Sequence, residues 1–386
     1  MLLGLAVSMM VQAQTIDTVL NKVSDQPFSF SAAVPDGNYR VTVTMGNRKK
    51  AGQTVVRAES RRHFFDLVST KKNQFETVTF VVNKHSPKIE GEVQVKLKPR
   101  ELEYNNWDDS LNLHFCGPSP AVQRIRIEPE REAVTVFLCG NSTVVDQEKE
   151  PWASWGQMIT RWFGPQVAIA NYAESGLSAS TFLAQLRLDK ILTQLRAGDY
   201  VICEFGHNDE KEKKAGDGAW YSYSRNLKIF VDRVREKGGQ IIFVTPTARR
   251  FFNDDHQTLA YTHGDYPEAM RMVAWREQVP LIELNGMTRT FYEALGYDGS
   301  KRALVHYPAN TFPDQPKPLA DNTHFNPFGA SEVAKMVVMG LKQLQSPLVN
   351  YLRADWLDFD PAYPDDPDAF VWYPSGTTNL IKPDGN

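Results

Sequence analysis

The strongest constraint on the fold is a change of sequence pattern near residue 130. After about residue 133, short apolar runs alternate with segments whose apolar residues recur at helical spacing. Such runs are typical of a parallel sheet that helices cover on both faces. The expected strands are Val134–Cys139, Val167–Asn171, Tyr200–Phe205, Gln240–Val244 and Leu281–Leu284. The expected helices are Trp155–Phe163, Thr181–Arg196, Tyr223–Lys237, Tyr266–Glu277, Thr288–Leu295 and Pro327–Leu344.

The chain before residue 130 has a different pattern. From about 28 to 130, short alternating segments such as NYRVTVTMG and FETVTFVVN are separated by Gly, Pro, Asn and Asp. This alternation predicts an all-β sandwich or jelly roll. We therefore expect a β-sandwich accessory domain at 15–130, an α/β domain at 131–345 and an irregular C-terminal extension at 346–386.

The first 14 residues, MLLGLAVSMMVQAQ, resemble a secretion signal. An apolar stretch is followed by Val11-Gln12-Ala13, which fits a small-residue cleavage site. No Lys or Arg precedes the apolar stretch, as one usually does in a secretion signal. We expect this segment to be removed and the protein to be secreted or periplasmic. No later segment is long and apolar enough to predict membrane insertion.

Composition argues against several classes of function. The 43 Lys and Arg nearly balance the 46 Asp and Glu, and no basic run is present, so nucleic acid is not an expected partner. The three cysteines imply no disulfide framework, and Cys139 and Cys203 lie in apolar runs where we expect buried thiols. Without a C-x-x-C or H-E-x-x-H motif, we expect no metal.

Polar residues follow several of the expected strands, at the sheet edge where active groups of α/β proteins gather. Ser142 follows the expected strand Val134–Cys139, and a serine nucleophile at this edge needs a base. His324 can be that base, and Asp321 can orient it from the same loop. Negative charge on a carbonyl oxygen needs preorganised donors. The candidates are the N–H groups of Ser142 and Gly176 and the amide of Asn208. Singly, these could be a turn glycine, a helix cap and loop residues, but their joint order favours catalysis.

With these residues the chain resembles the SGNH hydrolases, also called GDSL-like esterases, over about 133–345. The matching blocks are GNST, ESG, FGHND and DNTHFN. It is most similar to the rhamnogalacturonan acetylesterases, on GNSTVVD, WASWGQM, EFGHNDE, THGDYPEAMRMVAWREQVPLIEL and DNTHFNPFGA. The resemblance implies a flavodoxin-like three-layer α/β/α fold and a Ser142–His324–Asp321 triad that forms an acyl-enzyme. It implies no cofactor.

Some residues depart from this pattern or lie beside it. The family usually has Asp where this chain has Asn141, which keeps most of the hydrogen-bonding geometry and loses the charge, so we expect activity to survive. Asn141 and His207 are also candidate substrate-binding residues, and we interpret His207 as a packing or substrate-wall residue rather than as the base. The N-terminal region resembles galactose-binding-like jelly rolls, in which Trp107 could stack on a sugar or lie in the core.

The function that follows is a secreted serine esterase that removes O-acetyl groups from pectic polysaccharide, with rhamnogalacturonan as the first candidate. Its partner would be an acetylated plant cell-wall polysaccharide or oligosaccharide. A pectin methylesterase and an acetylesterase on another plant polysaccharide would use the same serine chemistry. An inactive carbohydrate-binding protein is an alternative of another class, and the complete set of reactive groups argues against it.

Overall fold

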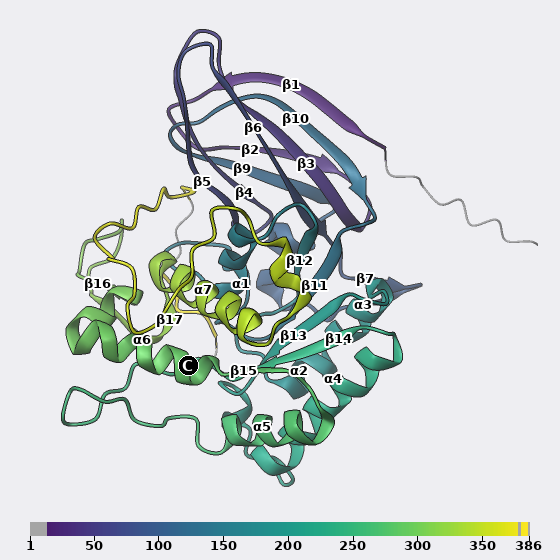
Figure 1. Cartoon of the computed structure of the whole chain (residues 1–386), viewed down its shortest axis with the longest axis vertical. Coiled ribbons are helices and arrows are strands. Elements are labelled where there is room, and N and C mark those ends of the chain that lie inside the picture. The colour runs from purple at the N-terminus through teal and green to yellow at the C-terminus, as the bar shows by residue number, and fades with distance from the viewer. Residues whose placement is uncertain (1–13, 377–379, 385–386) are drawn as a thin grey trace, which may run out of the picture.

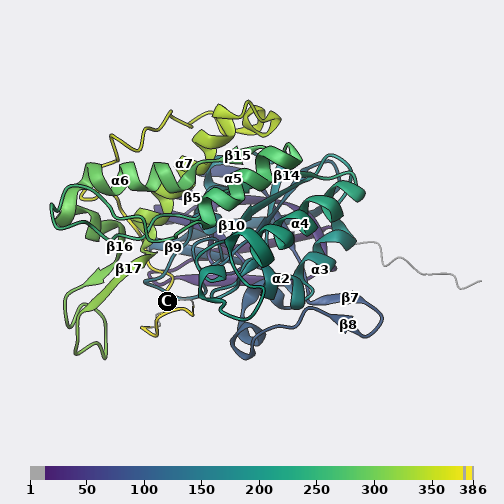
Figure 2. The same cartoon turned by 90° about the horizontal axis from the view of Figure 1, so that it is seen from below.

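The computed structural model describes residues 14–376 and 380–384, so the expected signal segment lies outside the described residues apart from Gln14. A β-rich part, purple and blue in Figure 1, stands on a part in which helices surround a central sheet. The same two parts are seen from below in Figure 2.

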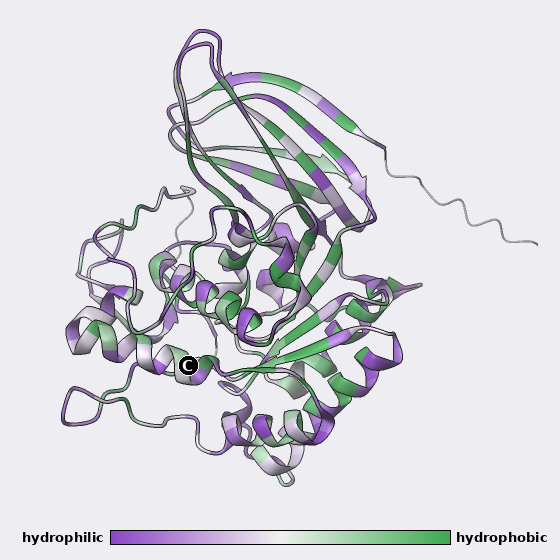
Figure 3. Ribbon diagram, in the orientation of Figure 1, coloured by the Kyte–Doolittle hydropathy of each residue, from purple (hydrophilic) through white to green (hydrophobic). Residues whose placement is uncertain are grey.

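The β-rich part consists of two four-stranded sheets in which all neighbouring strands are antiparallel. The first contains β1 (Ile16–Val23), β10 (Ala121–Glu130), β3 (Gly37–Gly46) and β6 (Phe75–Lys84) in that order. The second contains β2 (Phe28–Ala33), β9 (Ser110–Ser119), β4 (Gly52–Ala58) and β5 (Arg62–Thr70). Alternate residues of β3 are buried, and their side chains form a core with Phe115 and Ile125. Figure 3 shows this alternation along the strands.

The second part contains the predicted parallel sheet. Its strands, in spatial order, are β12 (Val167–Asn171), β11 (Val134–Cys139), β13 (Tyr200–Glu204), β14 (Gln240–Val244) and β15 (Leu281–Ile282). All four neighbouring pairs are parallel. Counted along the chain, the order is 2-1-3-4-5, as in flavodoxin-like folds, and it confirms the expected α/β class. Strand β11, the second in this order, lies where the order reverses, which is where such sheets place their active groups.

Helices cover both faces of this sheet. They are α1 (Trp155–Met158), α2 (Ala179–Ala184), α3 (Arg187–Gln194), α4 (Ser224–Glu236), α5 (Tyr266–Glu277), α6 (Leu284–Gly299) and α7 (Pro327–Gln343). Val136 and Leu138 of β11 pack with side chains of α1, α6 and α7, whereas Phe137 and Cys139 pack with α2, α3, α4 and α5. Successive residues of one strand therefore belong to two separate cores, which explains why the strand is apolar apart from Thr135.

Two predicted helices are interrupted. The segment predicted as one helix from Thr181 to Arg196 is two, because Leu186 adopts a left-handed conformation (φ 62°) between α2 and α3. This break leaves the Gln185 carbonyl to accept the N–H of Lys96, at 3.0 Å. The segment predicted from Trp155 to Phe163 is α1 followed by a short 3-10 helix. The short helices are η1 (Pro99–Glu103), η2 (Asn105–Trp107), η3 (Ile159–Trp162), η4 (Asp209–Lys211), η5 (Ala219–Tyr223, π-helical), η6 (Ser300–Ala303) and η7 (Pro347–Tyr351).

Two small ribbons complete the fold. The ribbon of β7 (Lys88–Glu90) and β8 (Val93–Gln94) lies beside α3 in both views (Figure 1 and Figure 2). The segment after it packs on the α/β part, where Trp107 is buried in the core and lies edge-on to Tyr172. Trp107 is thus a core aromatic. The other ribbon joins β16 (Leu304–Tyr307) to β17 (Leu319–Phe325), a strand where the sequence predicted a loop.

The C-terminal extension is irregular after η7 and crosses the surface of the α/β part. Ion pairs hold it there, including Arg161 with Asp355 and Lys335 with Asp365. Further along, Trp372 lies over the guanidinium of Arg57 from the β-rich part, 3.6 Å from ring centroid to Cζ. The extension therefore contacts both parts of the molecule.

Candidate active site

Ser142 lies in a tight turn at the carboxyl end of β11. The N–H of Val144 donates to the Asn141 carbonyl at 3.0 Å, which closes the turn. Gly140 is needed here for close approach, because a Cβ at this position would lie 2.4 Å from the Val144 side chain and 3.0 Å from the Glu204 carbonyl. The turn therefore packs directly against the neighbouring strand β13, and Ser142 stands at the edge of the sheet.

The structure brings Ser142, His324 and Asp321 into one hydrogen-bonded chain. His324 Nε2 lies 2.9 Å from Ser142 Oγ, and His324 Nδ1 lies 2.8 Å from Asp321 Oδ2. The other oxygen of Asp321 accepts the backbone N–H groups of Thr323 and His324, at 2.8 and 2.9 Å. Burial would raise the pKa of Asp321, but the hydrogen bonds from His324 and the backbone lower it below its usual range. The carboxylate therefore stays ionised at neutral pH, as the partner of an imidazolium must.

The strand β17 and the start of α7 hold the histidine in place. Asn326 caps α7, since its Oδ1 accepts the N–H of Gly329 at 3.0 Å, and Pro327 occupies the first helical position. The Asn326 amide also donates to the carbonyls of Arg302 and Leu304. These bonds fix the chain two residues after His324, so the imidazole is positioned by regular structure.

Gly176 and Asn208 line one cavity of about 380 Å³, whose lining does not include Ser142, His324 or Asp321. Gly176 has φ +80°, a conformation that favours glycine, and the amide of Asn208 donates to the Leu177 carbonyl at 3.0 Å. Gln147 joins the loop of Gly176 to the Ser142 turn, because its amide donates to the Ser142 carbonyl (3.0 Å) and the Ser175 hydroxyl (3.5 Å). The two remaining oxyanion candidates therefore lie in loops that border the same cavity.

A buried carboxyl group that sequence reasoning missed lies under the Ser142 turn. Glu204, at the end of β13, accepts hydrogen bonds from Trp155 Nε1 (2.5 Å), the Thr143 hydroxyl (2.8 Å) and the Thr247 N–H (3.2 Å). Burial raises the pKa of Glu204 to about 7. The only sign of it in the sequence is a glutamate inside the apolar run VICEF. It links the nucleophile turn to the strands below.

The position of Glu204 explains why an uncharged Asn suits position 141. Asn141 is fully buried, and its Oδ1 lies 3.0 Å from the same Thr143 hydroxyl that binds Glu204. An aspartate there would place a second carboxyl group on that hydroxyl, and two such groups resist ionising together. The structure also places Asn141 in the interior rather than on a substrate wall.

Asn141→Asp is therefore expected to destabilise the protein in a pH-dependent way. The folded-state pKa of Glu204 is already above its usual value of 4.5, so the stability linked to its protonated form is full below pH 4.5 and is lost as pH rises through about 7. The carboxyl group of Asp at position 141 would make this loss of stability at high pH larger. We expect the loss of unfolding free energy to be ~1–3 kcal/mol larger at pH 8 than at pH 5, as one or two pKa units imply. Urea unfolding at both pH values measures it, with Asn253→Asp in an exposed loop as control. Equal losses at both pH values would contradict this account.

Two aromatic side chains, His207 and Trp152, lie next to the site. His207 is buried edge-on against His263 with ring centroids 4.5 Å apart, and burial lowers its pKa well below the usual value. It is thus placed as a neutral packing residue. Trp152, which sequence reasoning did not select, lies edge-on to the His324 ring with centroids 5.7 Å apart. It limits the orientations open to the imidazole.

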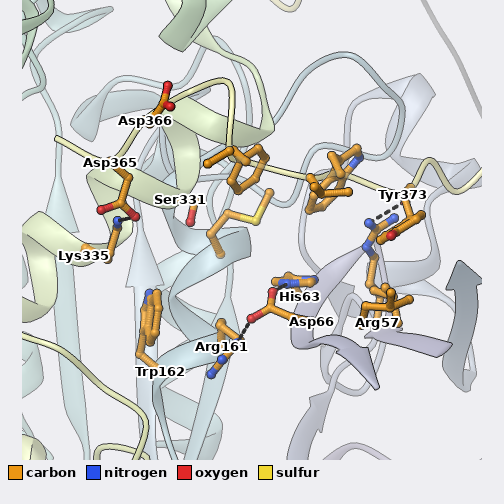
Figure 4. Close-up of a pocket in the computed structure, with 17 residues that line it drawn as sticks. Arg57, His63, Asp66, Arg161, Trp162, Ser331, Lys335, Asp365, Asp366 and Tyr373 are labelled. Carbon is orange, nitrogen blue, oxygen red and sulfur yellow. Dashed lines mark hydrogen bonds and ion pairs between the residues drawn. The ribbon is translucent and has the colours of Figure 1, made fainter. Parts of the chain in front are cut away.

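A second cavity, of about 560 Å³, lies between the β-rich part, α7 and the C-terminal extension. Figure 4 shows that several of its charged groups contact one another: His63 with Asp66, Asp66 with Arg161, and Lys335 with Asp365. Ser331 also lines this cavity, but among the described residues no hydrogen bond joins it to a histidine. The paired nucleophile and base therefore distinguish the Ser142 site.

In the described part of the chain, no group of three or more His, Cys, Asp or Glu side chains is placed to hold a metal ion. Cys116, Cys139 and Cys203 are free and buried, which confirms the expected thiols. Across residues 14–376 and 380–384, no helix has the length and apolar character that crossing a bilayer requires.

Comparison with known proteins agrees with this geometry. The model of the GDSL-like Lipase/Acylhydrolase family matches residues 138–331. Rhamnogalacturonan acetylesterase RhgT of Bacillus subtilis (strain 168) is 39% identical over 224 residues, which are 58% of this chain and 95% of that protein. The rhamnogalacturonan acetylesterase of Emericella nidulans is 27% identical over 237 residues, 56% of this chain and 88% of that protein.

A solved structure shares the fold over more of the chain. The crystal structure of the Bacillus subtilis protein YXIM covers 87% of this chain and 91% of its own, at 20% identity and a TM-score of 0.50. On the family match, the chain belongs to the GDSL-like lipase/acylhydrolase (SGNH) family, as a carboxylic ester hydrolase close in sequence to rhamnogalacturonan acetylesterases.

Proposed function

We propose that this protein is a secreted acetylesterase that removes O-acetyl groups from rhamnogalacturonan or a related pectic polysaccharide. The observation that carries the proposal is the 2.9 Å contact between Ser142 Oγ and His324 Nε2, with Asp321 behind the histidine. The substrate class comes from the relatives, two of which are named as rhamnogalacturonan acetylesterases and cover most of their own length in the match.

The reaction follows from the three side chains. Ser142 Oγ attacks the acetyl carbonyl while His324 takes the serine proton, and Asp321 stabilises the resulting imidazolium. The tetrahedral intermediate collapses to an acetyl-enzyme when His324 returns the proton to the sugar oxygen, which leaves as a hydroxyl group. Water, activated by His324, then attacks the acetyl-enzyme, and acetate leaves with Ser142 restored. The balance needs only water and the ester.

The negative oxygen of the intermediate needs donors in place before the reaction. The backbone N–H groups of Ser142 and Gly176 and the amide of Asn208 fill this role in our proposal. In support, Gly176 and Asn208 border the same cavity, and hydrogen bonds through Gln147 tie the glycine loop to the serine turn. The β-rich part is proposed to be a jelly-roll accessory module.

The proposal predicts which product appears from which polymer. Acetate should be released from acetylated rhamnogalacturonan faster than from acetylated homogalacturonan or acetylated xylan. Acetate and methanol are measured in the same reactions, with Ser142→Ala as the blank. Release of methanol from methylated pectin without acetate would favour the methylesterase, and hydrolysis of no ester at all would favour the carbohydrate-binding protein.

Asn208→Ala tests the oxyanion assignment. Loss of one preorganised donor should lower kcat by ~100- to 1000-fold, which corresponds to about 2.7–4 kcal/mol of barrier, with a smaller change in KM. The measurement is steady-state hydrolysis of p-nitrophenyl acetate. Asn310→Ala, in an exposed loop, serves as the control. A kcat for Asn208→Ala within threefold of the parent enzyme would remove Asn208 from the oxyanion hole.

A further inference from the structure

The end of the described chain lies on the loop that borders the site. A Cβ placed on Gly176 would lie 2.8 Å from Cβ of Asp384, so this aspartate packs directly on the glycine. Its carboxylate contacts two cations, Arg100 Nη1 at 2.7 Å and Lys98 Nζ at 3.2 Å. A carboxylate held by an ammonium and a guanidinium is thus found beside a proposed oxyanion donor.

Both cations are fixed to the loop of Gly176 independently of Asp384. Lys98 Nζ donates to the Ser175 carbonyl at 2.5 Å. Arg100 donates to Glu174 Oε1 through Nε at 2.9 Å and to the Ser175 carbonyl through Nη2 at 3.1 Å. Hydrogen bonds of this kind hold the two charges in place before any ligand arrives, which lowers the ordering cost of binding.

The two cations come from the segment that follows β8, in the β-rich half of the sequence. Glu101 anchors this segment, because its carboxylate forms a fully buried ion pair with Arg187 of α3, with Nη2 at 2.6 and 2.7 Å from the two carboxylate oxygens. The Glu101 side chain also accepts the backbone N–H of Lys98 at 2.8 Å. The segment is therefore a rigid platform on the α/β part.

The position of the cations suits an acidic ligand. Lys98 and Lys211 line the 380 Å³ cavity together with Gly176 and Asn208, and the acidic residue Glu212 lines it as well. Glu174, the acidic partner of Arg100, is buried, and burial raises its pKa above the usual value. Ammonium and guanidinium groups are the usual partners of carboxylates in binding sites.

We propose that Lys98 and Arg100 form a subsite for the carboxylate of a uronic acid residue next to the acetylated sugar. Asp384 occupies this subsite in the structure and competes with the substrate for it. The inference rests on the proposed polysaccharide substrate and deepens it. The β-rich half thus completes the substrate site of the α/β part, and the end of the chain must move when an acidic polymer binds.

The test compares Lys98→Gln with Lys96→Gln, which removes the same charge from an exposed position two residues away. The substrates are acetylated rhamnogalacturonan oligosaccharides and the same oligosaccharides with their carboxyl groups reduced to alcohols. The parent enzyme should have a higher kcat/KM for the acidic substrate, mainly through KM. Lys98→Gln should lower this preference about tenfold, whereas Lys96→Gln should retain it. An equal fall in both variants, or none in Lys98→Gln, would overturn the subsite.

Asp384→Asn should strengthen binding of the acidic oligosaccharide, whereas Lys98→Gln should weaken it. With the competing carboxylate neutralised, KM for the acidic oligosaccharide should fall severalfold, and KM for the reduced one should not. An unchanged KM for the acidic oligosaccharide would show that Asp384 does not occupy the subsite.

Inhibition of p-nitrophenyl acetate hydrolysis by galacturonate oligomers tests the subsite without requiring rhamnogalacturonan to be a substrate. The inhibition constant should rise about tenfold in Lys98→Gln and not in Lys96→Gln. Inhibition with this pattern but no acetate from rhamnogalacturonan would refute the proposed function and keep the subsite. Acetate release from rhamnogalacturonan with no inhibition by the oligomers would refute the subsite and keep the proposed function.

Discussion

Ser142→Ala is expected to lower kcat for ester hydrolysis by more than a thousandfold while the protein keeps its fold. The serine supplies the atom that forms the acetyl-enzyme, and its Oγ lies 2.9 Å from His324 Nε2. Without the nucleophile, the oxyanion donors and substrate binding can support only slow attack by water. The substitution removes one buried hydroxyl, so the backbone of the turn can stay as it is.

The measurement is hydrolysis of p-nitrophenyl acetate, with circular dichroism to establish folding. Ser331→Ala is the matched control, because Ser331 lines the 560 Å³ cavity and lies outside the proposed triad. It should retain the activity of the parent enzyme. Most of the activity surviving in Ser142→Ala, or lost in Ser331→Ala, would sink the assignment of Ser142 as nucleophile.

The sequence predicted element bounds best where the pattern of apolar residues allows only one buried arrangement. The bounds of β11, β12, β14 and α5 agree with prediction, because apolar runs and a helical repeat each allow one buried arrangement. Ser142 could be placed at the sheet edge because it follows the buried strand β11. His324 was paired with it because a serine nucleophile needs a base, and the structure places this histidine 182 positions away on β17, outside the parallel sheet.

The missed features depend on polar side chains that become buried in pairs. The segment Glu59–Arg62, which connects β4 to β5 and includes the first residue of β5, is the polar stretch ESRR, a composition that gives no sign of burial. In the structure all four of its residues are buried. Glu204 was missed because its hydrogen-bond donors Thr143, Trp155 and Thr247 lie 43 to 61 positions away in the sequence. A buried charge is stable only with its partner, and sequence pattern does not identify a partner more than eighty positions away.

The segment Glu59–Arg62 joins the β-rich part to the nucleophile segment. Arg61 Nη1 donates to the carbonyls of Gln147 (2.9 Å) and Trp152 (3.2 Å), and Gln147 in turn donates to Ser142. Arg62 Nε lies 2.5 Å from Asp146 Oδ2, and both side chains are fully buried. The segment that follows the nucleophile is therefore held by two arginines from the other part of the molecule. The β-rich part contributes to the order of the site as well as to its proposed subsite.

Arg62→Ala is accordingly expected to destabilise the α/β part by ~3–5 kcal/mol, because it leaves Asp146 as an unpaired buried charge. Asn171 and Asn106 would still donate to this carboxylate, but they carry no positive charge. Urea unfolding followed by tryptophan fluorescence measures the loss. All eight tryptophans lie at or after residue 107, so the signal reports on the α/β part and the extension.

The control is Arg124→Ala, which removes an arginine that also binds an aspartate, Asp17, through two nitrogens but at an exposed position. Exposed pairs are screened by water and salt, so this variant should unfold close to the parent protein. In the double variant Arg62→Ala/Asp146→Ala, the loss should be smaller than the sum of the two single losses, because no unpaired charge remains. Equal unfolding of Arg62→Ala and Arg124→Ala, or additive losses in the double variant, would show that this buried pair does not couple the two parts of the molecule.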